Sequence, residues 1–232
     1  VSGVNAEFAT TVPINTPGQW YHIAAAYDTG TNAYAVFIDG VAHLSGTYPG
    51  SLAVPAANRL SLGTRTGSTQ YFDGTLDDVR IYDGMLSVSE IADLYSAGNG
   101  GGPPTGTSNC SVAGSYRDDF NDRVWNGSNA GYDWSASPWL ELGENDGASA
   151  GDVQVMNDAS NYQLLIQGKD NGIEREVDLT DAVSATLSFD YSRRGLDNSI
   201  DYIAIFASSS GTTEPWTELP APRIEGSGND SN

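Results

Sequence analysis

The twelve residues at positions 71–82 read Tyr-Phe-Asp-Gly-Thr-Leu-Asp-Asp-Val-Arg-Ile-Tyr and indicate the class of fold. Between Thr75 and Tyr82, β-branched and aromatic residues recur, and such residues favour β-strands. Asp73-Gly74 and Asp83-Gly84 bracket this run, and Asp-Gly is a strong turn signal because glycine accepts positive φ angles. The stretch is therefore predicted to be one strand of an antiparallel all-β domain.

The same pattern of strands and turns precedes this stretch. Residues 19–27 are predicted to form a strand, and apolar residues alternate along the next one, at 34–38. Asp39-Gly40 then suits a tight hairpin turn that returns the chain through residues 41–44.

One short helix is predicted over residues 87–97. Ser87 can cap its first turn while Glu90, three residues on, reaches back in a capping box. An apolar stripe with helical spacing runs from Ile91 to Tyr95, and Gly98 ends the helix.

Residues 98–114 are rich in Gly, Pro, Ser and Thr, a composition that buries little apolar area and behaves as a linker. We therefore expect a first module at 1–97 and a second at 115–232. The chain through Gly98 carries 9 acidic and 3 basic residues (−6), and the remainder carries 21 and 7 (−14), so the second module is the more acidic. Strand patterns in it fall at 140–142, 153–156, 162–167, 173–179, 186–191 and 202–207. The predicted fold class is all-β, with two antiparallel β-sandwich (jelly-roll) modules in tandem.

Composition excludes several classes of function. The net charge is −20, and a field of that sign repels phosphate backbones and anionic lipid, so nucleic-acid binding is not expected. No apolar run approaches the roughly 20 residues of a membrane-spanning helix, so membrane insertion by this chain is not expected. Cys110 is the only cysteine, which excludes an intrachain disulfide.

Five segments of the first module occur in a telling order: Gln19-Trp20-Tyr21-His22-Ile23-Ala24, Val36-Phe37-Ile38-Asp39-Gly40, Leu62-Gly63, residues 71–82, and Leu86-Ser87 with Glu90-Ile91 and Leu94-Tyr95. Together they resemble the laminin-G-like (concanavalin A-like lectin/glucanase) jelly roll over about residues 1–97. The resemblance is to the later part of such a domain, which implies opening strands upstream of Val1.

The second module resembles MAM and galactose-binding-type jelly rolls of large secreted bacterial proteins. The residues that carry this resemblance are Arg117-Asp118-Asp119-Phe120, Val177-Asp178-Leu179, residues 185–191, Asp201-Tyr202-Ile203-Ala204-Ile205 and Trp216-Thr217-Glu218-Leu219. It implies that closing strands are missing, so we expect this module to be incomplete at its C-terminus. The order of the two modules is similar to surface-exposed parts of pilus-associated proteins, which implies an extracellular or cell-surface location.

Catalytic machinery is not evident. His22 and His43 are the only histidines, and neither is accompanied by a nucleophile motif, so we expect structural roles for both. Glucanases of the resembled superfamily carry Glu-x-Asp-x-x-Glu on one strand, whereas the nearest string here, at residues 174–178, has a different spacing. We therefore expect that the chain is not an enzyme.

Calcium is a plausible use of the many carboxylates, since this ion takes six to eight hard oxygen ligands. The resemblance to laminin-G-like folds implies an ion near Asp77, and the resemblance of the second module implies one near its opening acidic stretch. The candidate ligands are Asp77, Asp118, Asp119, Asp197 and Asp201. The alternative is that these residues form a solvated acidic face.

Sugar recognition uses aromatic rings that stack on the C–H face of the sugar, beside polar hydrogen-bonding groups. Residues 125–134 have this composition, with Trp125, Tyr132 and Trp134 as candidate ligand-binding residues. The alternative is that the tryptophans lie in the core.

These observations predict non-catalytic adhesion or carbohydrate-binding modules of a larger bacterial surface protein, stabilised by calcium and binding glycans. One alternative is a structural building block of an appendage or filament that binds other surface-protein subunits. Another is an accessory module of a polysaccharide-degrading enzyme. Because a partial jelly roll leaves strand edges unpaired, we also expect strand complementation by another chain or by flanking segments.

Overall fold

The computed structural model describes residues 8–9, 16, 18–47, 58–63, 72–98, 115–129, 131–134, 136–158, 161–168, 171–179, 182–193, 202–203, 205–208, 216–218 and 222–225. Their elements are, in chain order, β1 (Phe8–Ala9), β2 (Trp20–Asp28), β3 (Ala33–Ile38), β4 (Val41–Thr47), β5 (Asn58–Leu62), β6 (Gly74–Tyr82), α1 (Val88–Gly98), β7 (Ser115–Asp118), β8 (Leu140–Leu142), β9 (Val153–Asp158), β10 (Asn161–Ile166), β11 (Gly172–Val177), β12 (Ser184–Arg193), β13 (Tyr202–Ile203), β14 (Ile205–Ser208), β15 (Trp216–Glu218) and β16 (Pro222–Glu225). This part of the chain is mostly β with one helix, as expected from the sequence.

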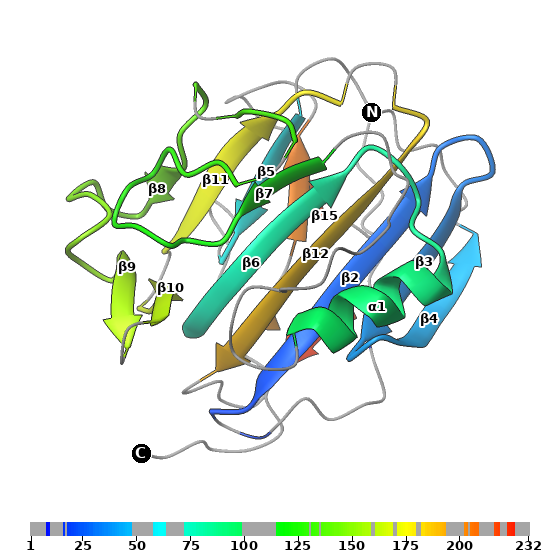
Figure 1. Ribbon diagram of the computed structural model, residues 1–232, viewed down its shortest axis with the longest axis horizontal. Coiled ribbons are helices and arrows are strands. Elements are labelled where there is room, and N and C mark those ends of the chain that lie inside the picture. The colour runs from blue at the N-terminus through cyan, green and yellow to red at the C-terminus, as the bar shows by residue number, and fades with distance from the viewer. Residues whose placement is uncertain are drawn as a thin grey trace.

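The strands form antiparallel sheets in a sandwich-like arrangement (Figure 1). The largest sheet has the order β4-β3-β2-β12-β6-β10-β9, and β7 also pairs with β6. A second sheet has the order β15-β14-β5-β11-β8, and a small third one joins β1, β16 and β13. The pair β1–β16 is parallel, and the other described pairs are antiparallel.

Strands of the two expected modules alternate within the same sheets. β12 lies between β2 and β6 in Figure 1 and is paired with both, with Phe189 opposite Ile23 and Leu187 opposite Ile81. β5 pairs in the same way with β11 on one side and β14 on the other. Two tandem sandwiches are therefore not confirmed. The expected linker lies almost entirely outside the described residues.

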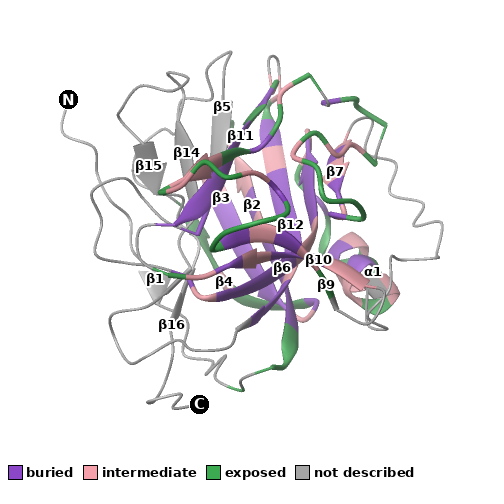
Figure 2. Cartoon of the chain, turned by 90° about the vertical axis from the view of Figure 1, so that its left-hand side faces the viewer, coloured by how far each residue is buried: buried purple, intermediate pink, exposed green. Residues whose placement is uncertain are grey.

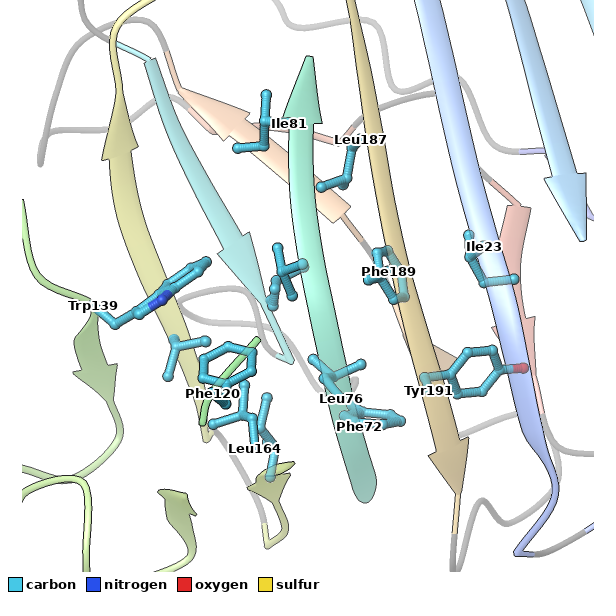
Figure 3. Close-up of a cluster of buried hydrophobic side chains, with 14 of the residues drawn as sticks. Ile23, Phe72, Leu76, Ile81, Phe120, Trp139, Leu164, Leu187, Phe189 and Tyr191 are labelled. Carbon is cyan, nitrogen blue, oxygen red and sulfur yellow. The ribbon is translucent and has the colours of Figure 1, made fainter. Parts of the chain in front are cut away.

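One hydrophobic cluster fills the space between the two larger sheets. Figure 3 shows Leu76 of β6 and Phe189 of β12 among its members, with Trp139 reaching in from the segment before β8. Leu62 of β5 and Ile173 of β11 contribute from the second sheet, and both are fully buried. Because residues of both segments build this cluster, the two segments share a core. In Figure 2, buried residues accordingly run along the central strands of the largest sheet.

Helix α1 lies on the outer face of the largest sheet, across β2 and β3 (Figure 1). Ile91 and Leu94 form a second buried cluster with Phe37 of β3 and other residues of that face. The predicted capping box is confirmed: the backbone N–H of Ser87 donates to Glu90 Oε2 at 2.8 Å, and the N–H of Glu90 donates to Ser87 Oγ at 3.3 Å.

Two backbone features shape the largest sheet. Asp39 and Gly40 have φ angles of 50° and 75°, as the predicted Asp-Gly hairpin between β3 and β4 requires. Asp78 also has a positive φ, 52°, at the point where the register between β6 and β12 shifts. The resulting β-bulge sends the side chains after Asp77 in new directions.

Candidate functional site

The aromatic segment between β7 and β8 divides into a buried part and an exposed part. Trp134 is 3% exposed, and the guanidinium carbon of Arg175 lies 3.9 Å from the centre of its ring. A ring covered in this way cannot stack on a sugar, so the prediction that Trp134 binds a ligand is corrected: it is a core residue.

Trp125 is half-buried and packs against the same core. Its indole N–H donates to Glu141 Oε1 at 2.8 Å, and its backbone carbonyl accepts the N–H of Trp139 at 2.7 Å. These contacts fix the ring and leave only part of it accessible. Trp125 therefore helps to hold the exposed segment in place, and its accessible part stays a candidate contact for a ligand.

Tyr132 is the exposed member of the three, at 37%. Its hydroxyl donates to Asp83 Oδ2 at 3.1 Å, and its backbone N–H donates to Ser115 O at 3.1 Å. The ring centroid lies 5.1 Å from that of Tyr116, which is almost fully buried. A hydrogen bond at each end and a ring beneath it hold Tyr132 in one orientation.

Polar side chains lie on the same segment as Tyr132. Ser128 Oγ donates to the carbonyl of Tyr132 at 3.4 Å and accepts the N–H of Trp134 at 3.3 Å. Asn126 and Asn129 are exposed on the same segment. An exposed aromatic face beside hydroxyl, amide and carboxylate groups matches the chemistry that binds sugars.

Asp118 is 1% exposed and fully engaged by the protein. Its Oδ2 accepts Nη1 of Arg175 at 2.9 Å and the indole N–H of Trp139 at 3.0 Å, while Oδ1 accepts the N–H of Phe120 at 3.0 Å. Burial lowers the pKa of Arg175 to about 10, against the opposing charge of Asp118. This carboxylate neutralises a buried arginine, which does not fit the expected role as a calcium ligand.

Asp77 and Asp78 differ sharply although they are neighbours. Asp78 accepts Nη2 of Arg80 and Nε of Arg117, each at 2.6 Å. Burial raises the pKa of Asp78, but the charges of the two arginines outweigh it and hold the pKa below its ordinary value. Asp77 accepts only the backbone N–H of Asp78, at 2.8 Å, among the described hydrogen bonds.

Sequence reasoning did not single out Asp190 of β12. This residue lies directly opposite Asp77 of β6 and directly opposite His22 of β2. Burial, with the charges of neighbouring carboxylates, raises the pKa of Asp77 to about 8 and that of Asp190 to about 7. Burial, followed by the charge of Arg80, lowers the pKa of His22 to about 4, so its ring is neutral. Only the strand pairing reveals this row, because Asp190 and Asp77 lie far apart in the chain.

His22 is buried, and its Nε2 is hydrogen-bonded to Ser188 Oγ at 2.8 Å. His43 lies on β4 and is exposed.

The remaining calcium candidates are not brought together. Asp119 is partly buried, with Oδ2 3.8 Å from Nη2 of Arg117. Asp197 and Asp201 lie outside the described residues. Within the part of the chain that the structure describes, no three His, Cys, Asp or Glu residues are grouped as metal ligands. The calcium ion expected from the sequence stays a prediction.

Two further carboxylates in the segment 141–153 act on the backbone. Glu141 accepts the N–H groups of Asp146 and Gly147, each at 2.9 Å. Glu144 accepts the N–H groups of Asp152 and Val153. These bonds replace strand pairing and hold the loop between β8 and β9 in shape.

Residues 2–92 match the family model described as the concanavalin A-like lectin/glucanases superfamily, a laminin G model. The first segment is therefore similar to laminin-G-like domains. The resemblance inferred for residues 1–97 is thereby confirmed, and the antiparallel sheets and helix α1 of the described residues agree with it. The match does not extend to the second segment, whose resemblance to MAM and galactose-binding-type modules stays a prediction. No curated protein matches the chain. Among the described residues, no helix is long and apolar enough to cross a membrane.

Proposed function

We propose that this chain is a non-catalytic glycan-binding unit of a larger bacterial surface protein, and that it acts outside the cell. The laminin-G-like segment supports a lectin-like role, because that superfamily includes lectins. The single observation that carries the proposal is Tyr132: it is an exposed aromatic ring held rigid among hydrogen-bonding groups.

A rigid ring suits a sugar for two reasons. Its flat face buries the C–H surface of a pyranose, and an ordered side chain loses little conformational entropy on binding. The hydrogen bond to Asp83 and the contact with Tyr116 fix Tyr132 before any ligand arrives. Polar groups of Ser128 and Asn126 lie on the same segment and can contact sugar hydroxyls.

Calcium has a smaller place in the proposal. Asp118 is paired with Arg175. Asp78, the neighbour of Asp77 in the chain, is paired with Arg80 and Arg117. A stabilising ion would therefore need carboxylates other than these, and Asp197 and Asp201 stay the candidates predicted from the sequence.

A glycan array followed by calorimetric titration tests the proposal. We expect the whole chain to bind at least one glycan class, and Tyr132→Ala to weaken that binding about fivefold or more, since a stacked ring commonly contributes about 1 kcal/mol or more. Met85→Ala is the matched control, because Met85 is similarly exposed, at 40%, outside the aromatic segment. Thermal melts of both variants show whether either one unfolds.

Absence of any glycan binding by the folded wild-type chain would overturn the proposal. If the chain instead assembles with itself as its concentration rises and no glycan binds, the structural building block is the better reading. Hydrolysis of a glycan by the chain would contradict a non-catalytic role.

A further inference from the structure

The surroundings of Tyr132 carry one sign of charge. Asp83, which follows β6 directly, accepts the Tyr132 hydroxyl at 3.1 Å and keeps acceptor capacity for further donors. The described ion pairs of Arg80, Arg117 and Arg175 are made with Asp78, Asp119 and Asp118. None of these pairs involves Asp83, whose described partner is the Tyr132 hydroxyl.

The two phenols beside Asp83 report the same field. The hydrogen bond to Asp83, followed by its charge, raises the pKa of Tyr132. Burial, followed by the charge of Asp178, raises the pKa of Tyr116, and Asp83 adds to this effect. The carboxylates of Asp83 and Asp178 both raise the pKa of a phenol here, so the surroundings of the exposed Tyr132 are electronegative.

A ring face beside a carboxylate is complementary to an ammonium group. The ring attracts a cation through its quadrupole, and the carboxylate accepts a charge-assisted hydrogen bond from it. A protonated 2-amino sugar offers an ammonium group and an apolar C–H face on one pyranose. We infer that the glycan bound at Tyr132 contains such free amino sugars, with Asp83 as the residue that selects the amine; this rests on the proposed function.

The same arrangement disfavours the other charge classes of glycan. Sulfated and uronic-acid chains meet both Asp83 and the field of a chain with net charge −20, so they are repelled. N-acetylated amino sugars keep the apolar face but lose the charge, so they retain stacking and lose the contact with Asp83. The contact between Asp83 and the amine therefore selects among glycans, and stacking on Tyr132 supplies most of the affinity.

The test compares two short oligosaccharides that differ only at nitrogen: a glucosamine dimer with free amines and its N,N′-diacetylated form. At about pH 6, where such amines carry their proton, we expect the free-amine dimer to bind roughly three- to thirty-fold more tightly. Asp83→Asn should bring the two affinities together, whereas Tyr132→Ala should weaken both. A heparin disaccharide should not bind.

Asp146→Asn is the matched control, because it removes the same charge from an exposed site in the loop between β8 and β9. Non-specific attraction by the acidic chain would make Asp146→Asn as damaging as Asp83→Asn, and that result would overturn the inference. Equal or tighter binding of the diacetylated dimer would also overturn it while leaving glycan binding intact. Failure of every glycan to bind would count against the proposed function itself.

Discussion

Asp118 and Asp77 lie on neighbouring strands of one sheet, and each is removed from water in a different way. Asp118 faces the core, where Arg175 and two N–H groups compensate its charge. Asp77 lies on the outer face opposite Asp190, with one backbone N–H as its described donor. The comparison teaches that a carboxylate removed from water either gains a cation and donors or holds its proton.

The largest effect is expected when the buried ion pair of Asp118 and Arg175 is broken. Arg175→Met removes the cation and leaves Asp118 buried with its charge unpaired, so we expect a loss of about 3–5 kcal/mol in the free energy of unfolding. Urea denaturation at neutral pH measures it. Adding Asp118→Asn should restore part of the loss, because the second change removes the uncompensated charge. A single variant within about 1 kcal/mol of wild type would show that this ion pair matters little.

A smaller effect is expected for Asp77 and Asp190, as a dependence of the free energy of unfolding on pH. The pKa of Asp77 rises from its ordinary 3.8 to about 8, and that of Asp190 to about 7, mainly through burial. The two carboxyls therefore bind more protons in the folded than in the unfolded chain between about pH 4 and 8, so their contribution to stability falls as pH rises through that window. The lowered pKa of His22 acts in the opposite direction between about pH 4 and 6.5. The charges of Asp39, Asp78, Arg80 and Asp119 act on the pair, and His22 lies directly opposite Asp190.

The variant Asp190→Asn tests whether Asp190 causes part of this pH dependence. An amide carries no charge to desolvate, so the variant should be more stable than wild type at about pH 9, by on the order of 1 kcal/mol, and should depend less on pH. Denaturation curves at several pH values measure both. A variant with the wild-type pH profile would mean that Asp190 does not hold a proton.

The smallest effect is expected at the exposed N-terminal cap of α1, which Ser87 and Glu90 form. Ser87→Ala removes the hydroxyl that accepts the N–H of Glu90 in the cap of α1, and we expect a loss of about 1 kcal/mol. The thermal midpoint should fall by a few degrees, and binding at Tyr132 should not change. A loss comparable to that of Arg175→Met would contradict the ranking of buried above exposed partners.

Local structure was predictable wherever neighbouring residues decide it. The Asp39-Gly40 turn, the capping box of Ser87 and Glu90, and the strands from β8 to β12 all occur where the pattern indicated. Exposure was not predictable, since Trp134 and Tyr132 are aromatic residues two positions apart, and the first is buried while the second is exposed. For the same reason the sequence did not distinguish Asp118 from other acids, because its partner Arg175 is 57 positions away.

The sequence by itself determined the mostly β character and the helix α1 of the described residues, the similarity of the first segment to laminin-G-like domains and the strongly negative net charge, because turn residues, side-chain alternation and charge act over a few positions or as a sum. The tertiary structure alone decided that β12 lies between β2 and β6, bringing Ser188 to His22 across 166 positions, and that Asp190 faces Asp77. Strand pairing depends on which distant edges meet and which faces become buried together, and no local pattern encodes that choice.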